Sequence, residues 1–265
     1  MINYPGMDTV NQGERIIAVL QARMTSTRLP GKVLMPLAGA PLLSRVIERV
    51  SRISGLDGIV VAIPSGDKQL PIVELVAGIP EVDLVSGSED DVLDRTLYAA
   101  TSAGATAIVR ITTDCPLIDP EVSSAVLGAF RKLGISYART AISHGYPMGF
   151  DTEVISVDAL KIAASESSDP YEREHVTPFI WRQPERFESI VLSCMPDRRH
   201  WRLTVDTPED YRLVSTVYDE LANVSPSFGM RELDALFKRR PELLELNAGT
   251  ASTPYIGLPS SYASS

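Results

Sequence analysis

Three cations lie close together in the stretch QARMTSTRLPGKVL, near the start of the chain. Arg23, Arg28 and Lys32 stand there among Ser, Thr, Pro and Gly residues, directly after the apolar run RIIAVL. A cationic turn that also offers the Ser26 and Thr27 hydroxyls is suited to hold a polyphosphate. The alternative is an ordinary turn that carries solvated charges.

This stretch is neither of the common phosphate-binding motifs. A Walker A loop needs Ser or Thr after its Gly-Lys pair, whereas Val33 follows Lys32, and Ser26 stands where the first glycine belongs. The G-x-G-x-x-G pattern of dinucleotide-binding loops is also absent from the stretch. The identity of the anion must therefore come from the rest of the chain.

Two aspartates further along the chain are left without a structural role. Asp119 precedes a proline that starts a helix and is suited to cap it, so Asp114 is left over at the end of an apolar run. In RLTVDTPED, Thr207 and Asp210 have the spacing of a helix cap, so Asp206 is left over. Mg2+ needs only one or two carboxylates when phosphate oxygens and water complete its shell. Cations beside a carboxylate-held metal favour phosphoryl or nucleotidyl transfer.

The composition limits what such a site can serve. With 265 residues, 44% of them hydrophobic, and a formal net charge of -9, the chain has a sizeable core and no nucleic-acid partner is expected. Neither a signal-peptide pattern nor an apolar run of about 18 residues occurs, so we predict a cytoplasmic protein with no membrane partner. Cys115 and Cys194 are too few for a disulfide framework and are expected to be buried apolar side chains.

Short apolar runs alternate with helical stretches from residue 15 to about residue 133. This alternation predicts an α/β fold with a mostly parallel, Rossmann-like sheet that is covered on both faces. Ligands bind at the carboxyl ends of such strands, so the loops after RIIAVL, VDLV and AIVRIT should share one rim. The expected strands span residues 15–22, 58–64, 82–87 and 107–114, and the expected helices span residues 42–53, 69–78, 91–104 and 120–133.

The order of elements changes beyond residue 134. A turn-rich stretch, SHGYPMGFDTEVI, and two helical segments come before the next strands, so we predict a flap inserted over roughly residues 136–193. In its segment EREHVTPFIWR, Val176, Phe179 and Ile180 stand at helical spacing, which predicts an apolar face for a homodimer. The helical segments of this half are expected at residues 157–167, 172–183, 208–221 and 230–246, and the strands at residues 186–193 and 201–206.

Six stretches of the chain resemble the motifs of one enzyme family. In order, they are LQARMTSTRLPGKVL, GSEDDVLDR, RITTDCPLIDP, YPMGFDTEV, YEREHVTPF and RLTVDTPED. They are similar to the spore-coat-polysaccharide type of cytidylyltransferase, related to the acylneuraminate and ketodeoxyoctonate cytidylyltransferases that make CMP-activated sugars. The resemblance spans roughly residues 15–221. It implies a fold of the glycosyltransferase-A/nucleotidyltransferase kind, with transfer of CMP from CTP to an acidic sugar, phosphonate or phosphate acceptor and release of pyrophosphate.

The resemblance also implies roles for individual residues. Asp114 and Asp206 match the magnesium-binding pair of the family, and with Arg23 and Lys32 they form the expected catalytic set, with Mg2+ as the cofactor. Residues 89–94 equally fit the acidic first turn of an ordinary helix, which leaves the contacts from that region open. The implied nucleotide contacts are Gln21, Ala22, Arg23, Ser26, Arg28, Lys32, Gly87, Asp91 and Asp114.

The acceptor side is less determined by the sequence. His175 is either an acceptor contact or a structural histidine, and Arg173 and Glu174 either line the acceptor pocket or form ion pairs that hold the flap. The expected acceptor contacts are Tyr146, Glu153, Arg173 and His175.

The resulting prediction is one nucleotidyltransferase domain over residues 15–240, between a disordered segment at residues 1–14 and a flexible tail at residues 241–265. Two other functions stay open at this point. One is a transferase of the same fold that uses a nucleotide-sugar donor, and the other is a non-catalytic nucleotide-binding subunit.

Overall fold

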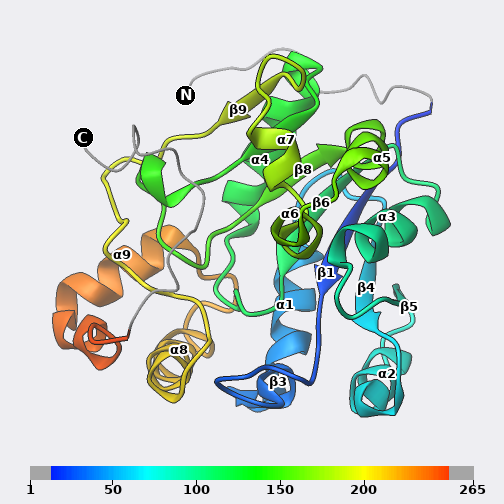
Figure 1. Cartoon of the computed structure of the whole chain (residues 1–265). Coiled ribbons are helices and arrows are strands. Elements are labelled where there is room, and N and C mark those ends of the chain that lie inside the picture. Colours follow the sequence, from blue (N-terminus) through cyan, green and yellow to red (C-terminus); the bar gives the residue numbers. More distant parts are fainter. Residues whose placement is uncertain (1–12, 251–265) are drawn as a thin grey trace.

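The computed structural model describes residues 13–250, and its centre is a seven-stranded sheet with helices on both faces (Figure 1). The first four strands in the sheet order run parallel, and β8 runs antiparallel to both of its neighbours. The order is β5 (Val82–Gly87), β4 (Gly58–Pro64), β1 (Ile16–Gln21), β6 (Ala107–Thr112), β8 (Glu153–Ser156), β7 (Tyr137–Arg139) and β9 (Ser189–Val191).

Side-chain alternation along β1 divides the interior into two cores. Ile16, Ala18 and Leu20 face one side of the sheet, and Ile17 and Val19 face the other. The first side is covered by α1 (Leu42–Val50), α2 (Leu70–Ala77), α4 (Pro120–Leu133), α8 (Pro208–Leu221) and α9 (Met230–Arg239). The second is covered by α3 (Val92–Ser102), α5 (Val157–Glu166), α6 (Pro170–His175) and α7 (Pro178–Trp181). Short elements complete the fold, namely a hairpin of β2 (Pro36–Leu37) and β3 (Ala40–Pro41), and the 3-10 helices η1 (Lys32–Leu34), η2 (Asp67–Gln69), η3 (Ile142–His144) and η4 (Pro241–Leu246).

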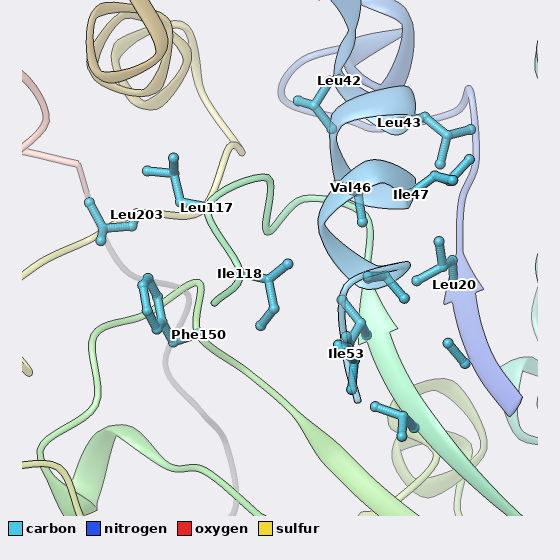
Figure 2. Close-up of a cluster of buried hydrophobic side chains, with 14 of the residues drawn as sticks. Leu20, Leu42, Leu43, Val46, Ile47, Ile53, Leu117, Ile118, Phe150 and Leu203 are labelled. Atoms are coloured by element: carbon cyan, nitrogen blue, oxygen red, sulfur yellow. The ribbon is translucent and has the colours of Figure 1, made fainter. Parts of the chain in front are cut away.

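The predicted parallel sheet of the first half is confirmed. Its buried strands are near-continuous apolar runs because helices cover both faces. Figure 2 shows one of these contacts, where Leu43 and Ile47 of α1 lie beside Leu20 of β1. Gln21 at the end of β1 is the register partner of Thr112 at the end of β6, so the loops after these two strands begin side by side.

The predicted flap over residues 136–193 is not a separate insertion. Strands β7, β8 and β9 all lie in this range and extend the same sheet beyond β6. Val176, Phe179 and Ile180 pack into the second core, with exposed fractions of 0%, 9% and 0%. The prediction that they form an open face for a second subunit is therefore wrong.

The helix predicted over residues 172–183 is broken in the middle. Val176 has φ 73° and ψ -54°, and the Thr177 amide donates to the His175 carbonyl at 2.9 Å, which forms a γ-turn. Positive φ is costly for a β-branched residue, and the complete burial of the Val176 side chain holds this conformation. Helix α6 ends before this turn, and α7 begins after it at Pro178.

The segment over residues 201–206 was expected to be a strand, but it forms only one isolated bridge, between Met148 and Arg202. It is nevertheless anchored, because the Leu203 amide donates to the Met148 carbonyl and the Val205 amide donates to the Asp114 carbonyl, each at 2.8 Å. Gly149 makes this close approach possible. A Cβ atom at Gly149 would lie 2.7 Å from the carbonyl carbon of Leu203.

The predicted terminal segments are corrected where the structure describes them. Residues 241–250 are not a loose tail, because η4 is followed by Asn247, and both Leu243 and Asn247 are buried. Glu14 pairs with Arg131 at 2.8 Å. The other residues of the two predicted segments, 1–12 and 251–265, lie outside the described residues. Cys115 and Cys194 are buried free thiols, as predicted.

We expect Gly149→Ala to destabilise the fold by about 2 kcal/mol or more, because φ is +100° there and the new Cβ would meet the backbone of Leu203. Gly128→Ala is the matched control, since Gly128 lies in α4 with nothing within 4 Å of an added Cβ and should gain about 0.5–1 kcal/mol. Urea unfolding of both variants measures the two changes. Equal stability of the two variants would contradict the close approach.

Candidate functional site

A cleft of about 330 Å3 opens at the carboxyl ends of β1 and β6. Its walls come from the loop after β1, the loop after β6, and helices α3 and α6. The lining residues are Gln21, Ala22, Arg23, Ser26, Thr27, Arg28, Lys32, Val33, Val92, Arg95, Arg110, Thr112, Thr113, Asp114, Glu174, His175 and Asp206.

Most of the residues singled out in the sequence lie at this cleft. The structure brings together Gln21, Ala22, Arg23, Ser26, Arg28, Lys32, Asp114, His175 and Asp206. The other predicted contacts are elsewhere, namely Gly87, Asp91, Tyr146, Glu153 and Arg173.

The loop after β1 is held by backbone and side-chain hydrogen bonds. Gly31 adopts a left-handed conformation, with φ 71°, and its amide donates to the Met24 carbonyl at 3.0 Å. The Met24 amide in turn donates to Oε1 of the buried Gln69 at 2.9 Å. These bonds close the loop and place η1, which begins at Lys32, directly above the strand ends.

Lys32 is buried, with an exposed fraction of 8%. Its Nζ atom donates to the Val205 carbonyl at 2.7 Å and to Asp206 Oδ1 at 2.9 Å, and it lies 3.6 Å from Asp114 Oδ2. The alternative of a turn with solvated charges is therefore wrong for Lys32. Arg28 stays more open, and its Nη2 lies 3.1 Å from Asp206 Oδ2.

The two unassigned aspartates converge on the Lys32 ammonium. Because Nζ lies 2.9 Å from one carboxylate oxygen and 3.6 Å from the other, those oxygens are no more than about 6.5 Å apart, within the span of one hydrated divalent ion. Burial by itself raises the pKa of Asp114. The charge of Lys32 and hydrogen bonds have a larger, opposite effect, so the pKa of Asp114 lies below its ordinary value. Arg202 Nη2 also contacts Asp206 Oδ2, at 3.1 Å. The site is thus a pair of carboxylates with a cation between them.

Glu153 does not line the cleft itself but pairs with Arg110, which does. It is buried, its Oε1 accepts from the Tyr137 hydroxyl and from Thr177 Oγ1, and its Oε2 pairs with Arg110. Burial raises the pKa of Glu153, but Arg110 and the hydroxyl donors bring it below its usual range. Arg110 Nη2 continues the chain of bonds to Gln21 Oε1, at 2.9 Å. These bonds give Glu153 a structural role, and its contact with an acceptor stays a prediction.

Asp91 and Arg173 bind each other. Asp91 caps α3 by accepting from the Asp94 amide at 2.9 Å, and Arg173 Nε donates to Asp91 Oδ2 at 2.8 Å. Arg173 Nη1 also donates to the Ala164 carbonyl at 2.7 Å, which ties α6 to α3 and α5. The structure thus shows the helix cap for Asp91 and the ion pair for Arg173, and their ligand contacts stay predictions.

Tyr146 and Gly87 also have structural positions. Tyr146 packs in the first core with an exposed fraction of 7%, and burial raises its pKa. Gly87 ends β5 beside Arg95, where a Cβ atom would lie 3.2 Å from Arg95 Cγ. Gly87 therefore makes room for a side chain that lines the cleft, although it does not line the cleft itself.

Two arginines of the cleft were missed in the sequence. Arg110 lies inside the strand AIVRIT, where a charge in an otherwise apolar run was an available signal. Arg95 is 4% exposed, and its Nη1 donates to the Ser88 carbonyl. Burial lowers the pKa of Arg95, and the charge of Arg23 adds to this effect. The sequence around Arg95 contains no comparable signal, because DVLDRT is typical of an ordinary amphipathic helical turn.

His175 lies at the cleft margin, on the last turn of α6. Its ring centroid is 4.3 Å from that of Tyr171. Desolvation by the surrounding protein lowers the pKa of His175, which favours the neutral imidazole. A neutral ring can both donate and accept a hydrogen bond at the cleft.

Residues 17–236 match a family model described as Cytidylyltransferase. The chain belongs to the cytidylyltransferase family. This membership places it among the CTP-dependent nucleotidyltransferases and confirms the resemblance carried by the six motifs. A match over most of the chain also favours this activity over a transferase that uses a nucleotide-sugar donor.

Known relatives agree with the family assignment. Spore coat polysaccharide biosynthesis protein SpsF of Bacillus subtilis is 33% identical over 236 residues, which cover 86% of this chain and 95% of that protein. The structure of a cytidylyltransferase from Leptospira borgpetersenii has a TM-score of 0.82 and 29% identity, and the match covers 87% of this chain and 97% of that one. A CMP:2-keto-3-deoxy-manno-octonic acid synthetase complexed with CTP has a TM-score of 0.60 at 18% identity, covers 78% of this chain and 99% of that one, and supports the fold.

The cytidylyltransferase fold here contains, within residues 13–250, no helix with the length and apolar character needed to cross a membrane.

Asp151 is a third carboxylate near the pair, and it was also missed in the sequence. Burial, together with the charges of Asp114 and Glu153, raises its pKa to about 6. The folded state thus binds this proton more tightly than the unfolded chain, so the stabilisation is present below pH 4 and is lost as the pH rises through 6. An ionised Asp151 is therefore unfavourable at neutral pH.

We expect Asp151→Asn, measured without metal or nucleotide, to raise the free energy of unfolding at pH 8 by on the order of 1–3 kcal/mol. The gain should nearly vanish at pH 4, where the wild-type carboxyl is protonated. Asp158→Asn, at a position with 87% side-chain exposure, is the control for general effects of charge. Urea unfolding at the two pH values measures both variants. A gain that is equal at pH 4 and pH 8 would contradict the raised pKa.

Proposed function

We propose that this cytidylyltransferase transfers CMP from CTP to an acidic sugar, or to a related phosphonate or phosphate acceptor, and releases pyrophosphate. One observation carries the proposal, namely that a cationic loop and two converging carboxylates face the same cleft. A relative named 3-deoxy-manno-octulosonate cytidylyltransferase, from Anaeromyxobacter dehalogenans, supports an acidic sugar as acceptor. It is 36% identical over 116 residues, which cover 43% of this chain and 46% of that protein.

The loop after β1 binds the triphosphate in this proposal. Arg23, Arg28 and Lys32 carry the positive charge, and the Ser26 and Thr27 hydroxyls supply further donors on the same wall. Several cations around one polyphosphate neutralise the charge that builds up when pyrophosphate departs. The loop therefore serves both to bind CTP and to stabilise the leaving group.

Asp114 and Asp206 are the residues that would hold Mg2+. The Lys32 ammonium lies within 3.6 Å of an oxygen of each carboxylate, and two carboxylates that converge on one cation support a divalent ion at this donor set. Within residues 13–250 no group of three or more His, Cys, Asp or Glu side chains is arranged to hold a metal, so phosphate oxygens and water would complete the shell. A manganese complex of Rv0371C from Mycobacterium tuberculosis, with a TM-score of 0.53 and 16% identity, has the same fold. When bound, the ion would neutralise and orient the reacting phosphate.

The chemistry needs no protein nucleophile. The acceptor oxygen attacks the α-phosphorus in line and forms a new P–O bond, and a hydroxyl acceptor gives up its proton to water. The bond from the α-phosphorus to the oxygen that bridges to the β-phosphorus breaks, so pyrophosphate leaves with the electron pair. Lys32 exchanges its carboxylate partners for phosphate oxygens, and Arg23 and Arg28 neutralise the leaving group. Arg110 and His175 line the same cleft and are suited to receive an anionic acceptor.

The homodimer stays a prediction, and the buried apolar face of α7 no longer supports it. Light scattering at micromolar concentration tests it directly, and a strictly monomeric mass would contradict it.

We expect pyrophosphate release with CTP and an acidic sugar, and slower release with UTP, ATP or GTP. The assay covers each nucleotide against a panel of acidic sugars, phosphonates and neutral sugars of matched size, with Mg2+ present. Neutral sugars should be poor acceptors, since they offer no anionic group to pair with the Arg110 guanidinium that lines the cleft. Turnover that requires a nucleotide-sugar donor, or binding of CTP without turnover on any acceptor, would contradict the proposed reaction.

We expect Lys32→Met to weaken CTP binding about tenfold or more, because a charged phosphate partner is lost. The same change should cost about 1–3 kcal/mol of stability, since Asp114 and Asp206 then face each other without the ammonium. Calorimetric titration with CTP and urea unfolding measure the two effects. Arg231→Met, at a side chain with 93% exposure, is the control and should change neither quantity. Unchanged CTP affinity in folded Lys32→Met would contradict the phosphate contact.

A further inference from the structure

A buried polar cluster lies behind the proposed metal carboxylate Asp206. We call it the support cluster, and it consists of Arg202, Asp206, Asp210 and Asn247. Asp210, at the start of α8, is completely buried, and Asn247 is 5% exposed. These residues are not part of the cleft lining, apart from Asp206 itself.

Asp206 is held by this cluster through its side chain and its backbone. Arg202 Nη2 donates to Asp206 Oδ2 at 3.1 Å and to Asp210 Oδ2 at 3.0 Å, while Arg202 Nε donates to Asp210 Oδ1 at 2.8 Å. The Asp206 amide donates to Asp210 Oδ2 at 3.0 Å. The direction of the Asp206 carboxylate therefore depends on where Arg202 and Asp210 lie.

Asn247 closes the cluster from the C-terminal side. Its Nδ2 donates to Asp210 Oδ1 at 2.8 Å and to the Arg202 carbonyl at 2.9 Å, so one amide group contacts both residues that hold Asp206. The preceding η4 packs against α8 and α9 and buries Leu243. This packing fixes the position of Asn247 relative to α8. Asn247 also lies beyond residues 17–236, the part matched by the family model.

We infer that Asn247 is a positioning residue for Asp206, and that the C-terminal segment thereby strengthens metal binding. A buried Asp210 that loses one donor shifts toward its other partners, chiefly Arg202, and Arg202 also donates to Oδ2 of Asp206. Partners behind a metal ligand typically change metal affinity by about 10–100-fold. This inference rests on the proposed role of Asp206 as a metal ligand.

The test is Asn247→Leu in the full chain, which removes both donors at similar size. Mn2+ binding is followed by electron paramagnetic resonance with a non-hydrolysable CTP analogue present. We expect the Mn2+ affinity to fall about tenfold or more, while CTP binding without metal changes less than twofold. If Asn247→Leu does not fold by circular dichroism, Asn247→Ser, which keeps a polar group but shortens it, is measured in its place. Unchanged Mn2+ affinity in the folded variant overturns the inference.

Two further variants separate the possible causes. Leu244→Ala changes a partly buried side chain of the same segment that makes no hydrogen bond to the support cluster, and should leave the Mn2+ affinity within twofold. An equal loss in Leu244→Ala would overturn the inference, because docking of η4 and not Asn247 would then control the metal. Asp206→Asn tests the proposed function itself, since unchanged Mn2+ affinity there removes the metal role of Asp206. Loss in Asp206→Asn with no loss in Asn247→Leu overturns only the positioning role.

Discussion

The site depends on one electrostatic constraint, which is that two carboxylates cannot stay close together without a cation. Asp114 comes from the end of β6 and Asp206 from a segment that is far away in the sequence, and their repulsion would separate those segments. The Lys32 ammonium contacts both carboxylates. Because it is buried, few water molecules compete with the carboxylates for its hydrogen bonds. Through its bond to the Val205 carbonyl it further fixes the backbone that carries Asp206. The Lys32 charge thus holds together the loop after β1, the end of β6 and the segment that carries Val205 and Asp206.

A second set of charges organises the cleft floor in a similar way. Arg110 and Arg139 are the register partners of Glu153 on its two neighbouring strands, so a carboxylate lies between two guanidinium groups across β6, β8 and β7. Glu153 is buried and fully bonded, and its charge offsets part of the positive charge that a half-buried row of arginines would carry. Because Arg110 also bonds Gln21, this row links the wall expected to bind the nucleotide to Thr177, in the turn that follows the helix carrying His175.

The sequence allowed the parallel half of the sheet, both unassigned aspartates and the cationic loop to be predicted, because each rests on local patterns. Apolar runs determine buried strands, and the capping roles of Asp119 and Thr207 left Asp114 and Asp206 unassigned. The failures rest on contacts between distant segments. Burial of Val176 against α3 and α5 and the bonding of Glu153 by three partners have no local signal. The docking of Asn247 on α8 could not be predicted either, because Asn247 begins the uncharged polar stretch NAGTAST, whose composition is typical of a tail.

The hydrogen bond from Lys32 to Val205 joins residues 173 positions apart, and this separation bears on how the enzyme is made. During synthesis the cationic loop and Asp114 leave the ribosome long before Val205 and Asp206 do. A nascent chain that ends before Val205 has the cations of the proposed phosphate site but lacks Asp206, which pairs with them, and contacts of such long sequence separation form late. The proposed site is therefore complete only after residue 206 has been translated, and a product truncated before it lacks one of the two carboxylates however well its sheet folds.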